Sequence, residues 1–430
     1  MSERADRPHT QVSRLSMAIA AISTVVEWYD FTVYLYLSTV LSRVFFGGGQ
    51  GSLLATFGGF AVAYLMRPLG AVVFARIGDR FGRRRMMLLS VGVMAPAMLA
   101  TALLPTRAEI GPAAGWLLIL LRCVMGFSVG GEYTGVVAYL LEGARPERRG
   151  LVASSASAAS EVGGLLAVGV SAATVQALSP ADLAAWGWRI PFLVGAGLAA
   201  AIGLARSTLD ESPDFERQQA AGTTPAQPLR HALTVSRAGV ARGFAISALG
   251  SITYYVGITY APAFLVTAGA LSEGRALWLS TVAAVAVILV TPLTGAVSDR
   301  VGRKPVLIGL GVAAAVLPIT LFSLMASGFE ARALVGAVVL ACLAGAVSAV
   351  GAVATAEQLP GEGRLSGLAL GATTATAIFG GLTPYIAQVL LGQTGWAMAP
   401  GAMIAVVGLC VLPVLLTLRE TAPRRAPSPG

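Results

Sequence analysis

The strongest constraint on this chain is a succession of apolar stretches, each about as long as a helix needs to cross a bilayer. A window of about 19 residues predicts twelve of them. They lie near residues 17–41, 52–74, 86–105, 115–141, 151–177, 186–206, 242–267, 277–297, 305–326, 333–357, 365–391 and 399–418. Because a helix satisfies its own backbone hydrogen bonds within hydrocarbon, we expect an all-α integral membrane protein with twelve transmembrane helices.

The scarcity of charge argues against a soluble protein. Charged residues form 12% of the 430 residues and hydrophobic residues form 56%, whereas soluble domains carry about 25% charged residues. Cys123, Cys342 and Cys410 have no paired spacing, and His9 and His231 lie in polar stretches. We therefore expect no enzyme, no metal and no bound cofactor, and proton chemistry inside the membrane must use carboxylates.

The basic residues indicate the orientation of the chain. With both termini placed inside, the inner segments carry 23 Lys and Arg residues and the outer segments carry 5. Because cytoplasmic loops are enriched in these residues, we predict a multi-pass protein of the inner or plasma membrane with both termini cytoplasmic. The same distribution explains the net charge of +9. The expected partners are therefore the lipid bilayer, a small-molecule substrate and protons, with no nucleic acid.

A repeated loop divides the chain into two similar halves. GDRFGRR at 78–84 and SDRVGRK at 298–304 each lie between the second and third spans of a six-span set. The longest polar interruption, 207–241, separates the two sets. We predict an N-terminal six-helix half at 1–206, a cytoplasmic linker at 207–241 and a C-terminal six-helix half at 242–430, with short cytoplasmic tails. Duplicated halves occur in transporters that rock around a central site.

Several further strings occur in the order typical of one family. They are VEWYDF at 26–31, RPLG at 67–70, RCVMGFSVGGEYTG at 122–135, WGWRIPF at 186–192 and IFGGLTP at 378–384. With the two loops, they make the chain resemble the major facilitator superfamily, and within it the metabolite:proton symporters that include permeases for proline and betaine, 2-oxoglutarate, shikimate and citrate. The resemblance implies the major facilitator fold, inward transport driven by a proton gradient, and a functional monomer.

The resemblance also implies a gate at the cytoplasmic face. In this superfamily the aspartate and arginines of such loops pair across the two halves and favour the outward-open state. Asp79, Arg83, Asp299 and Arg303 match those positions. Charge-assisted hydrogen bonds from a short loop to the opposite half suit that purpose physically. The alternative is that these arginines enforce membrane topology alone, and the two roles are compatible.

Ionisable residues inside the predicted spans gather in the first half. They are Glu27, Asp30, Glu132, Glu161, Arg67 and Arg122. A charge at the bilayer centre costs roughly 2.5–3.5 kcal/mol, so each needs a partner, a watery cavity or a function. Glu27 and Asp30 share a helix face, where two ionised carboxylates repel each other.

Proton coupling needs one acid that binds a proton facing outside and releases it facing inside. We predict that at least one of the four acids Glu27, Asp30, Glu132 and Glu161 has this role. The alternative is that the acids form fixed ion pairs with the two arginines and hold the helices together.

The second half offers neutral side chains at the same depth. Tyr254 and Tyr255 lie in the seventh span and Gln388 lies in the eleventh. We predict a substrate site in which Arg67 and Arg122 bind a carboxylate, because a guanidinium fork suits that group. The neutral residues would close on the substrate from the other half. The alternative is that the aromatic residues serve packing alone.

These features predict a proton-coupled symporter that imports a small carboxylate-bearing metabolite, such as an organic acid, by alternating access. One alternative substrate is a zwitterionic osmolyte or amino acid. Four acids against two arginines leave the site too negative for a citrate-like trianion, and tyrosines bind cationic nitrogen. Glu161 lies outside the family strings, so we expect it to contribute to this protein's own choice of substrate. The other alternative is an exporter of a drug-like or secondary metabolite.

Overall fold

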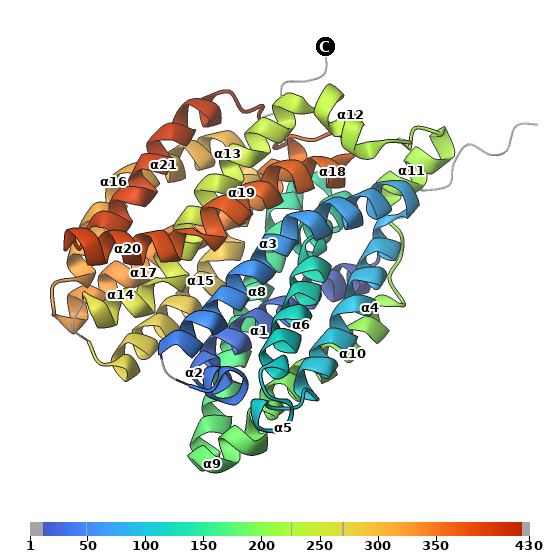
Figure 1. Ribbon diagram of the computed structural model, residues 1–430. Coiled ribbons are helices and arrows are strands. Elements are labelled where there is room, and N and C mark those ends of the chain that lie inside the picture. The colour runs from blue at the N-terminus through green and yellow to red at the C-terminus, as the bar shows by residue number, and fades with distance from the viewer. Residues whose placement is uncertain (1–11, 49, 225, 269–270, 424–430) are drawn as a thin grey trace, which may run out of the picture.

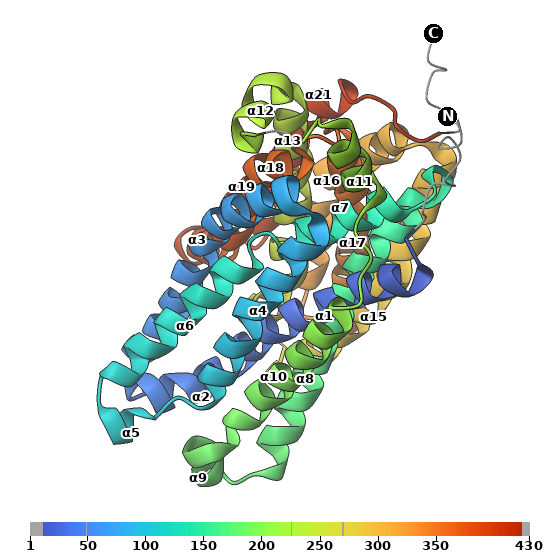
Figure 2. The same cartoon turned by 90° about the vertical axis from the view of Figure 1, so that its right-hand side faces the viewer.

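The computed structural model describes residues 12–48, 50–224, 226–268 and 271–423. Every regular element within these ranges is helical. Figure 1 shows two bundles side by side, one coloured from blue to green and the other from yellow to red, and Figure 2 shows them turned by 90°. The all-α architecture predicted from the sequence is confirmed.

The first bundle holds the long helices between Arg14 and Arg206. They are α1 (Arg14–Tyr36), α3 (Gln50–Phe81), α4 (Arg83–Ala102), α6 (Ala113–Val129), α7 (Glu132–Gly143), α8 (Arg149–Ala177) and α10 (Arg189–Arg206), with the short α2 (Ser38–Leu41), α5 (Arg107–Ile110) and α9 (Pro180–Asp182). Two further helices, α11 (Pro213–Ala221) and α12 (Pro228–Val235), follow within the predicted linker.

The second bundle begins at Arg237, inside the predicted linker rather than after it. Its helices are α13 (Arg237–Tyr254), α14 (Ala261–Thr267), α15 (Glu273–Val301), α16 (Arg303–Met325), α17 (Glu330–Glu357), α18 (Arg364–Leu368), α19 (Thr374–Thr376), α20 (Thr383–Thr394) and α21 (Ala399–Leu416). We call the end of the molecule at which α11 and α12 lie, at the top of Figures 1 and 2, the linker end.

The count of membrane-crossing helices is close to the twelve expected. Within the described ranges, 10 helices are long and apolar enough to cross a membrane, or 11 when the pair Arg237–Thr259 and Ala261–Thr267, bent by 46°, counts as one. Helix α1 is not among them, because Glu27 and Asp30 lower its mean hydropathy. It nevertheless packs inside the first bundle against α8 and α10.

The two repeated loops adopt the same backbone conformation. Gly82 precedes α4 with φ 104° and ψ 151°, and Gly302 precedes α16 with φ 114° and ψ 152°. Residues with a side chain rarely adopt this positive φ, so glycine is needed at both turns. A glutamate then accepts the first backbone N–H of each following helix, with Glu211 2.8 Å from the nitrogen of Arg83 and Glu420 2.9 Å from that of Arg303. The sequence repeat is therefore also a structural repeat.

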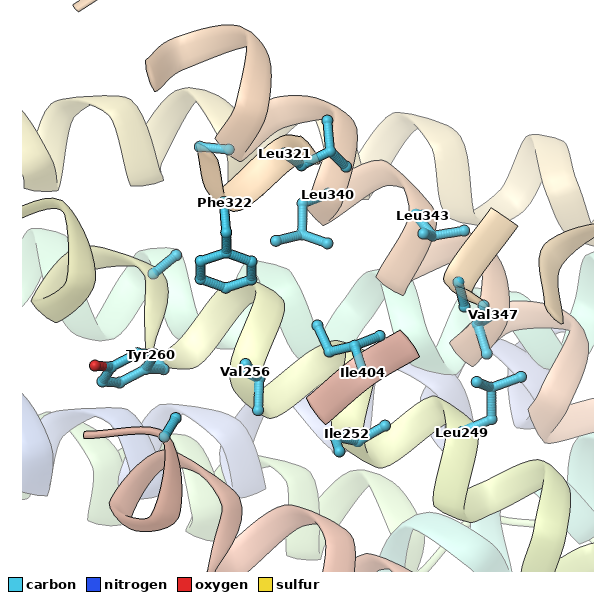
Figure 3. Packing of buried hydrophobic residues seen from close by; sticks show 14 of the residues in the cluster. Leu249, Ile252, Val256, Tyr260, Leu321, Phe322, Leu340, Leu343, Val347 and Ile404 are labelled. Carbon is cyan, nitrogen blue, oxygen red and sulfur yellow. The ribbon is translucent and has the colours of Figure 1, made fainter. Parts of the chain in front are cut away.

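Buried apolar side chains form a core in each bundle and a further core between the bundles. Part of the second bundle's core is drawn in Figure 3, where Leu249 and Phe322 are labelled. The core between the bundles joins Phe74 of α3 to Val353 of α17 and Leu365 of α18. Because α18 lies at the linker end (Figures 1 and 2), this core packs the two bundles together there.

Candidate functional site

A cavity of about 160 Å³ lies between the two bundles. One water needs roughly 10–15 Å³, so the cavity has room for a small metabolite. Among the described residues that line it, the charged ones are Glu27, Arg67 and Glu161, and all three come from the first bundle. The second bundle contributes neutral polar side chains, namely Ser247, Ser251, Tyr254, Tyr255, Thr291, Ser348, Thr355, Thr373 and Thr376.

Arg67 is held in the cavity by one carboxylate and two aromatic rings. Its Nη1 lies 3.4 Å from Oε1 of Glu27, and its guanidinium carbon lies 4.6 Å from the ring centre of Tyr64 and 5.2 Å from that of Phe31. Oε2 of Glu27 is buried and has no hydrogen-bond partner among the described residues. The Arg67 side chain is 14% exposed, so the guanidinium remains accessible from the cavity.

The glycines of the fourth span bring α6 against the helix that carries Arg67. A Cβ atom on Gly126 would lie 2.0 Å from the carbonyl oxygen of Ala63, and one on Gly130 would lie 2.1 Å from the carbonyl oxygen of Arg67 itself. Small residues permit this close approach of two membrane helices. The GxxxG spacing therefore helps to position the backbone of Arg67.

Asp30 pairs with Arg122 beside the main cavity. Nη1 of Arg122 donates to Oδ2 of Asp30 at 2.7 Å, and Nη2 donates to Thr101 at 3.0 Å. Both residues line a smaller pocket that also includes Glu27 and Arg67, but neither lines the main cavity. Oδ1 of Asp30 is buried without a partner in the part of the chain that the structure describes.

Glu132 lies outside both pockets and is fully paired. Its carboxylate accepts hydrogen bonds from Arg206 and from Ser90, and Arg206 also donates to Ser23 and to the carbonyl oxygen of Met87, the latter at 2.9 Å. Arg206 and Glu132 are both completely buried. The structure therefore identifies a further buried arginine–carboxylate pair, beside those of Glu27 and Asp30.

The role of Arg206 was not predicted from the sequence, in which it is one of the basic residues of the inner segments. A signal was present in the sequence. Phe192, Ala196 and Ala199 are buried positions of α10, and Arg206 continues their helical spacing of three, four and seven residues. A residue on the buried face of a helix points into the bundle, even at the end of a span.

Glu161 contacts the opposite bundle through a tyrosine. The Tyr254 hydroxyl donates to Oε1 of Glu161 at 2.6 Å. The Tyr254 ring lies 5.3 Å from the ring of Trp28 and 5.5 Å from that of Tyr255, measured between centroids. Tyr255 in turn shares a hydrogen bond with Tyr64 of α3. Two predicted substrate-binding residues, Tyr254 and Tyr255, therefore line the cavity and join the bundles.

The helices of the second bundle are irregular beside the cavity. Three π-helical turns occur there, Tyr255–Thr259, Ala369–Thr373 and Ala377–Gly381, and each contributes a lining residue. Such turns interrupt the regular hydrogen-bond ladder and are frequent at functional sites. Gln388 does not line the cavity; its Oε1 accepts a hydrogen bond from Tyr260 at 2.7 Å.

The predicted gate residues join the bundles at the linker end. Asp79, at the end of α3, accepts the backbone N–H groups of Leu365 at 3.2 Å and Ser366 at 2.8 Å, in the first turn of α18. Asp299, at the end of α15, accepts those of Gly150 at 2.8 Å and Leu151 at 2.9 Å, in the first turn of α8. Each aspartate thus caps a helix of the other bundle, where a negative charge is favoured.

The arginines of the same loops complete these contacts. Arg83 donates to both oxygens of Glu142 at 3.0 Å, and Glu142 also accepts from Arg364 of the second bundle at 2.7 Å. Arg303 lies 2.8 Å from Asp299 and 3.2 Å from Glu357. These networks are almost fully buried and hold the bundles together at the linker end.

Comparison with known proteins gives matches over most of the chain. The family described as "Sugar (and other) transporter" matches residues 16–226, and the family described as "Major Facilitator Superfamily" matches residues 270–430. The chain is 35% identical over 371 residues to the alpha-ketoglutarate permease of Escherichia coli, covering 86% of this chain and 85% of that one. It is 33% identical over 411 residues to the ectoine/proline transporter of Corynebacterium glutamicum, covering 91% and 82%.

The fold also matches a solved structure. The proton:xylose symporter XylE bound to 6-bromo-6-deoxy-D-glucose superposes with a TM-score of 0.78 over 95% of this chain and 96% of that one, at 19% sequence identity. At this level of identity the likeness concerns the fold, and it places the two bundles in the arrangement of that transporter.

Proposed function

The chain belongs to the major facilitator superfamily, and from that premise we propose that it is a proton symporter that imports a small carboxylate-bearing metabolite by alternating access. The family consists of transporters, so the protein is not an enzyme. One observation carries the proposal: Arg67 lies in the cavity between the bundles, and Glu27 is its ion-pair partner among the described residues.

The pairing suggests how proton and substrate binding are coupled. A substrate carboxylate and the Glu27 carboxylate compete for the same guanidinium, because Arg67 has one fork to offer the cavity. Protonation of Glu27 removes that competition and favours substrate binding to Arg67. Loss of the proton on the inner side restores the Glu27–Arg67 pair and favours release. Glu27 is therefore our first candidate for the proton-coupling acid, with Asp30 beside it.

The remaining predicted acids have other environments. Glu132 is bound by Arg206 and Ser90 and lies outside the cavity, which supports a structural role. Asp30 keeps one unpartnered oxygen beside Arg122, so its protonation would free a second arginine. We propose that Arg67 binds the substrate carboxylate in the main cavity, and that Arg122 acts in the smaller pocket.

We also propose that the linker end is cytoplasmic. It carries the basic loops around Arg80, Arg84 and Arg300, which cytoplasmic faces favour. The contacts of Asp79 and Asp299 then form a cytoplasmic gate, and the described arrangement is closed on that side. Substrate would enter from the opposite end and leave after these contacts break.

The experiment that tests the function is uptake into proteoliposomes under an imposed inward proton gradient. The panel includes labelled 2-oxoglutarate, citrate, proline and glycine betaine. We expect accumulation of a carboxylate-bearing compound that a protonophore abolishes. Accumulation that persists with protonophore, or net export of a larger compound with no uptake of the panel, would show that the proposal is wrong.

A further inference from the structure

Glu161 differs from every other buried carboxylate in the described ranges. Seven aspartate and glutamate residues are buried there, and six of them form an ion pair with arginine. Glu161 is 8% exposed and has a single described hydrogen bond, from the Tyr254 hydroxyl. A buried carboxylate without a cationic partner is costly, so the missing positive charge must come from elsewhere or the group must be neutral.

The second oxygen of Glu161 faces the cavity. Glu161 lines the cavity, and this oxygen has no described hydrogen bond, yet it is not among the buried unpartnered atoms. A ligand in the cavity is therefore able to contact it directly. The described residues provide no cationic partner for Glu161, and a molecule bound in the cavity is positioned to provide one.

Aromatic rings surround the same position. Trp28, Tyr254 and Tyr255 all line the cavity, and the Tyr254 ring, whose hydroxyl binds Glu161, contacts the other two. Aromatic faces attract a cationic nitrogen within about 6 Å of the ring centre. A carboxylate beside such rings is the chemistry that recognises an ammonium group, including one that is fully methylated and has no N–H to donate.

The charge balance of the cavity points the same way. In the proposed binding state, with Glu27 protonated, the cavity holds the positive charge of Arg67 and the negative charge of an ionised Glu161. A dicarboxylate or tricarboxylate would leave the cavity with a net negative charge, whereas a zwitterion places its carboxylate at Arg67 and its nitrogen at Glu161.

We infer that Glu161, with Trp28 and Tyr254, forms a subsite for a cationic nitrogen, and that the transported metabolite is a zwitterionic amino or quaternary ammonium acid. The inference rests on the proposed function, whose carboxylate site at Arg67 forms the other pole. It selects the zwitterion over the organic acid that we first expected from the sequence.

The test is calorimetric binding to the purified full-length protein, with proline, glycine betaine and 2-oxoglutarate as ligands. Glu161→Gln keeps the size of the side chain and a hydrogen-bond partner for Tyr254 but removes the charge. We expect the wild type to bind at least one zwitterion, and the dissociation constant to rise by about tenfold or more in this variant. Binding of 2-oxoglutarate should not weaken. Glu161→Asp, which restores the charge, should recover part of the affinity.

Other results would overturn the inference. These are a wild type that binds neither zwitterion, or a Glu161→Gln variant that folds, as judged by its unfolding temperature, and binds zwitterions as well as the wild type. If Glu161→Gln binds zwitterions normally and loses only proton-driven accumulation, Glu161 has a role in proton coupling and not in binding the cationic nitrogen. If proton-driven uptake of 2-oxoglutarate occurs and does not change in Glu161→Gln, the inferred subsite is wrong but the proposed symport stands. If zwitterions bind in a Glu161-dependent way but are not taken up with protons, the subsite stands and the proposed symport is wrong.

Discussion

At the scale of single residues, the three arginine–carboxylate pairs that lie within the predicted spans of the first bundle differ in how fully the carboxylate is bound. Glu132 has partners for both oxygens, whereas Glu27 and Asp30 each keep one buried oxygen without a partner. The incompletely bound pairs line pockets, and the complete pair does not. The oxygen without a donor leaves part of the charge of Glu27 and Asp30 unsatisfied, whereas several donors stabilise the charge of Glu132.

Glu27→Gln is expected to separate proton coupling from transport itself. The amide cannot take up the proton, but it no longer competes for Arg67, so substrate binding should persist. Proteoliposomes with this variant should lose accumulation driven by a proton gradient and keep counterflow exchange. Loss of exchange as well would assign Glu27 to substrate binding or to helix packing. Asp30→Asn, measured in parallel, shows whether the neighbouring pair shares the role.

Arg67→Gln is expected to weaken binding of the substrate carboxylate. A hydrogen bond to a charged group contributes about 1.5–3 kcal/mol, so the dissociation constant should rise by about tenfold or more. The measurement is calorimetric titration of the purified variant. Arg67→Lys keeps the charge but loses the two-pronged guanidinium, so its dissociation constant should lie between those of Arg67→Gln and the wild type. An unchanged affinity in a folded Arg67→Gln protein would exclude this arginine as the anchor.

Arg206→Met is expected to destabilise the fold without a direct effect on the cavity. Removing one partner of a buried ion pair costs about 3–5 kcal/mol because the other charge is left unpaired. The unfolding temperature in detergent should therefore fall. The double variant Arg206→Met/Glu132→Gln should recover much of the lost unfolding temperature, because it contains no unpaired buried charge. A single variant as stable as the wild type would contradict the structural role of this pair.

At the scale of helices, the proposed gate consists of helix ends capped by the opposite bundle. Asp79 binds the first turn of α18 and Asp299 the first turn of α8. Gly150 and Gly295 meet beside the second cap, where a Cβ atom on either would lie within 2.5 Å of the other's carbonyl oxygen. Because each cap spans both bundles, it exists in one arrangement of the bundles and must break in the other.

Asp79→Ala is expected to favour opening at the linker end. Loss of a helix cap costs about 0.5–2 kcal/mol, which corresponds to roughly a two- to thirtyfold shift in the equilibrium. A cysteine at Leu368, buried in the core between the bundles, would report the shift by faster reaction with a thiol reagent. The background protein would have Cys123, Cys342 and Cys410 replaced by alanine.

Glu147→Gln provides the matched control for this gate prediction. Glu147 is an exposed acid in the turn Pro146–Arg148, so its substitution removes a charge without removing a helix cap. It should leave the reaction rate of the reporter unchanged. Equal rates in Asp79→Ala, Glu147→Gln and the unsubstituted background would mean that the cap does not hold the gate closed.

At the scale of the whole molecule, the two bundles share an architecture but not a chemistry. The repeated loops, their glycines and their capping glutamates correspond. The charged groups of the cavity all belong to the first bundle, as far as the described residues show. We interpret the first bundle as the part that binds charge and the second, with its π-helical turns, as the part that closes on the substrate.

The membrane potential alone is expected to drive uptake of a zwitterion. One proton with a neutral zwitterion moves one positive charge inward, and 100 mV then supplies about 2.3 kcal/mol, or up to about fiftyfold accumulation. The measurement is uptake under a potassium diffusion potential with equal pH on both sides. A dianion with one proton carries net negative charge, so an inside-negative potential should retard it. Uptake that ignores the potential would contradict one-proton symport of a zwitterion.

The membrane architecture, the repeated loop, and the acids and arginines inside the spans could all be predicted from the sequence alone. Hydropathy, loop charge and the cost of a buried charge are properties of short segments, so Glu27, Arg67 and Glu161 stood out without a fold. Only the tertiary structure decided which groups meet. It paired Arg206 with Glu132, 74 residues apart, and left Glu161 without an arginine partner in the described part of the chain. Such pairings depend on how distant helices pack, and no local pattern encodes that packing.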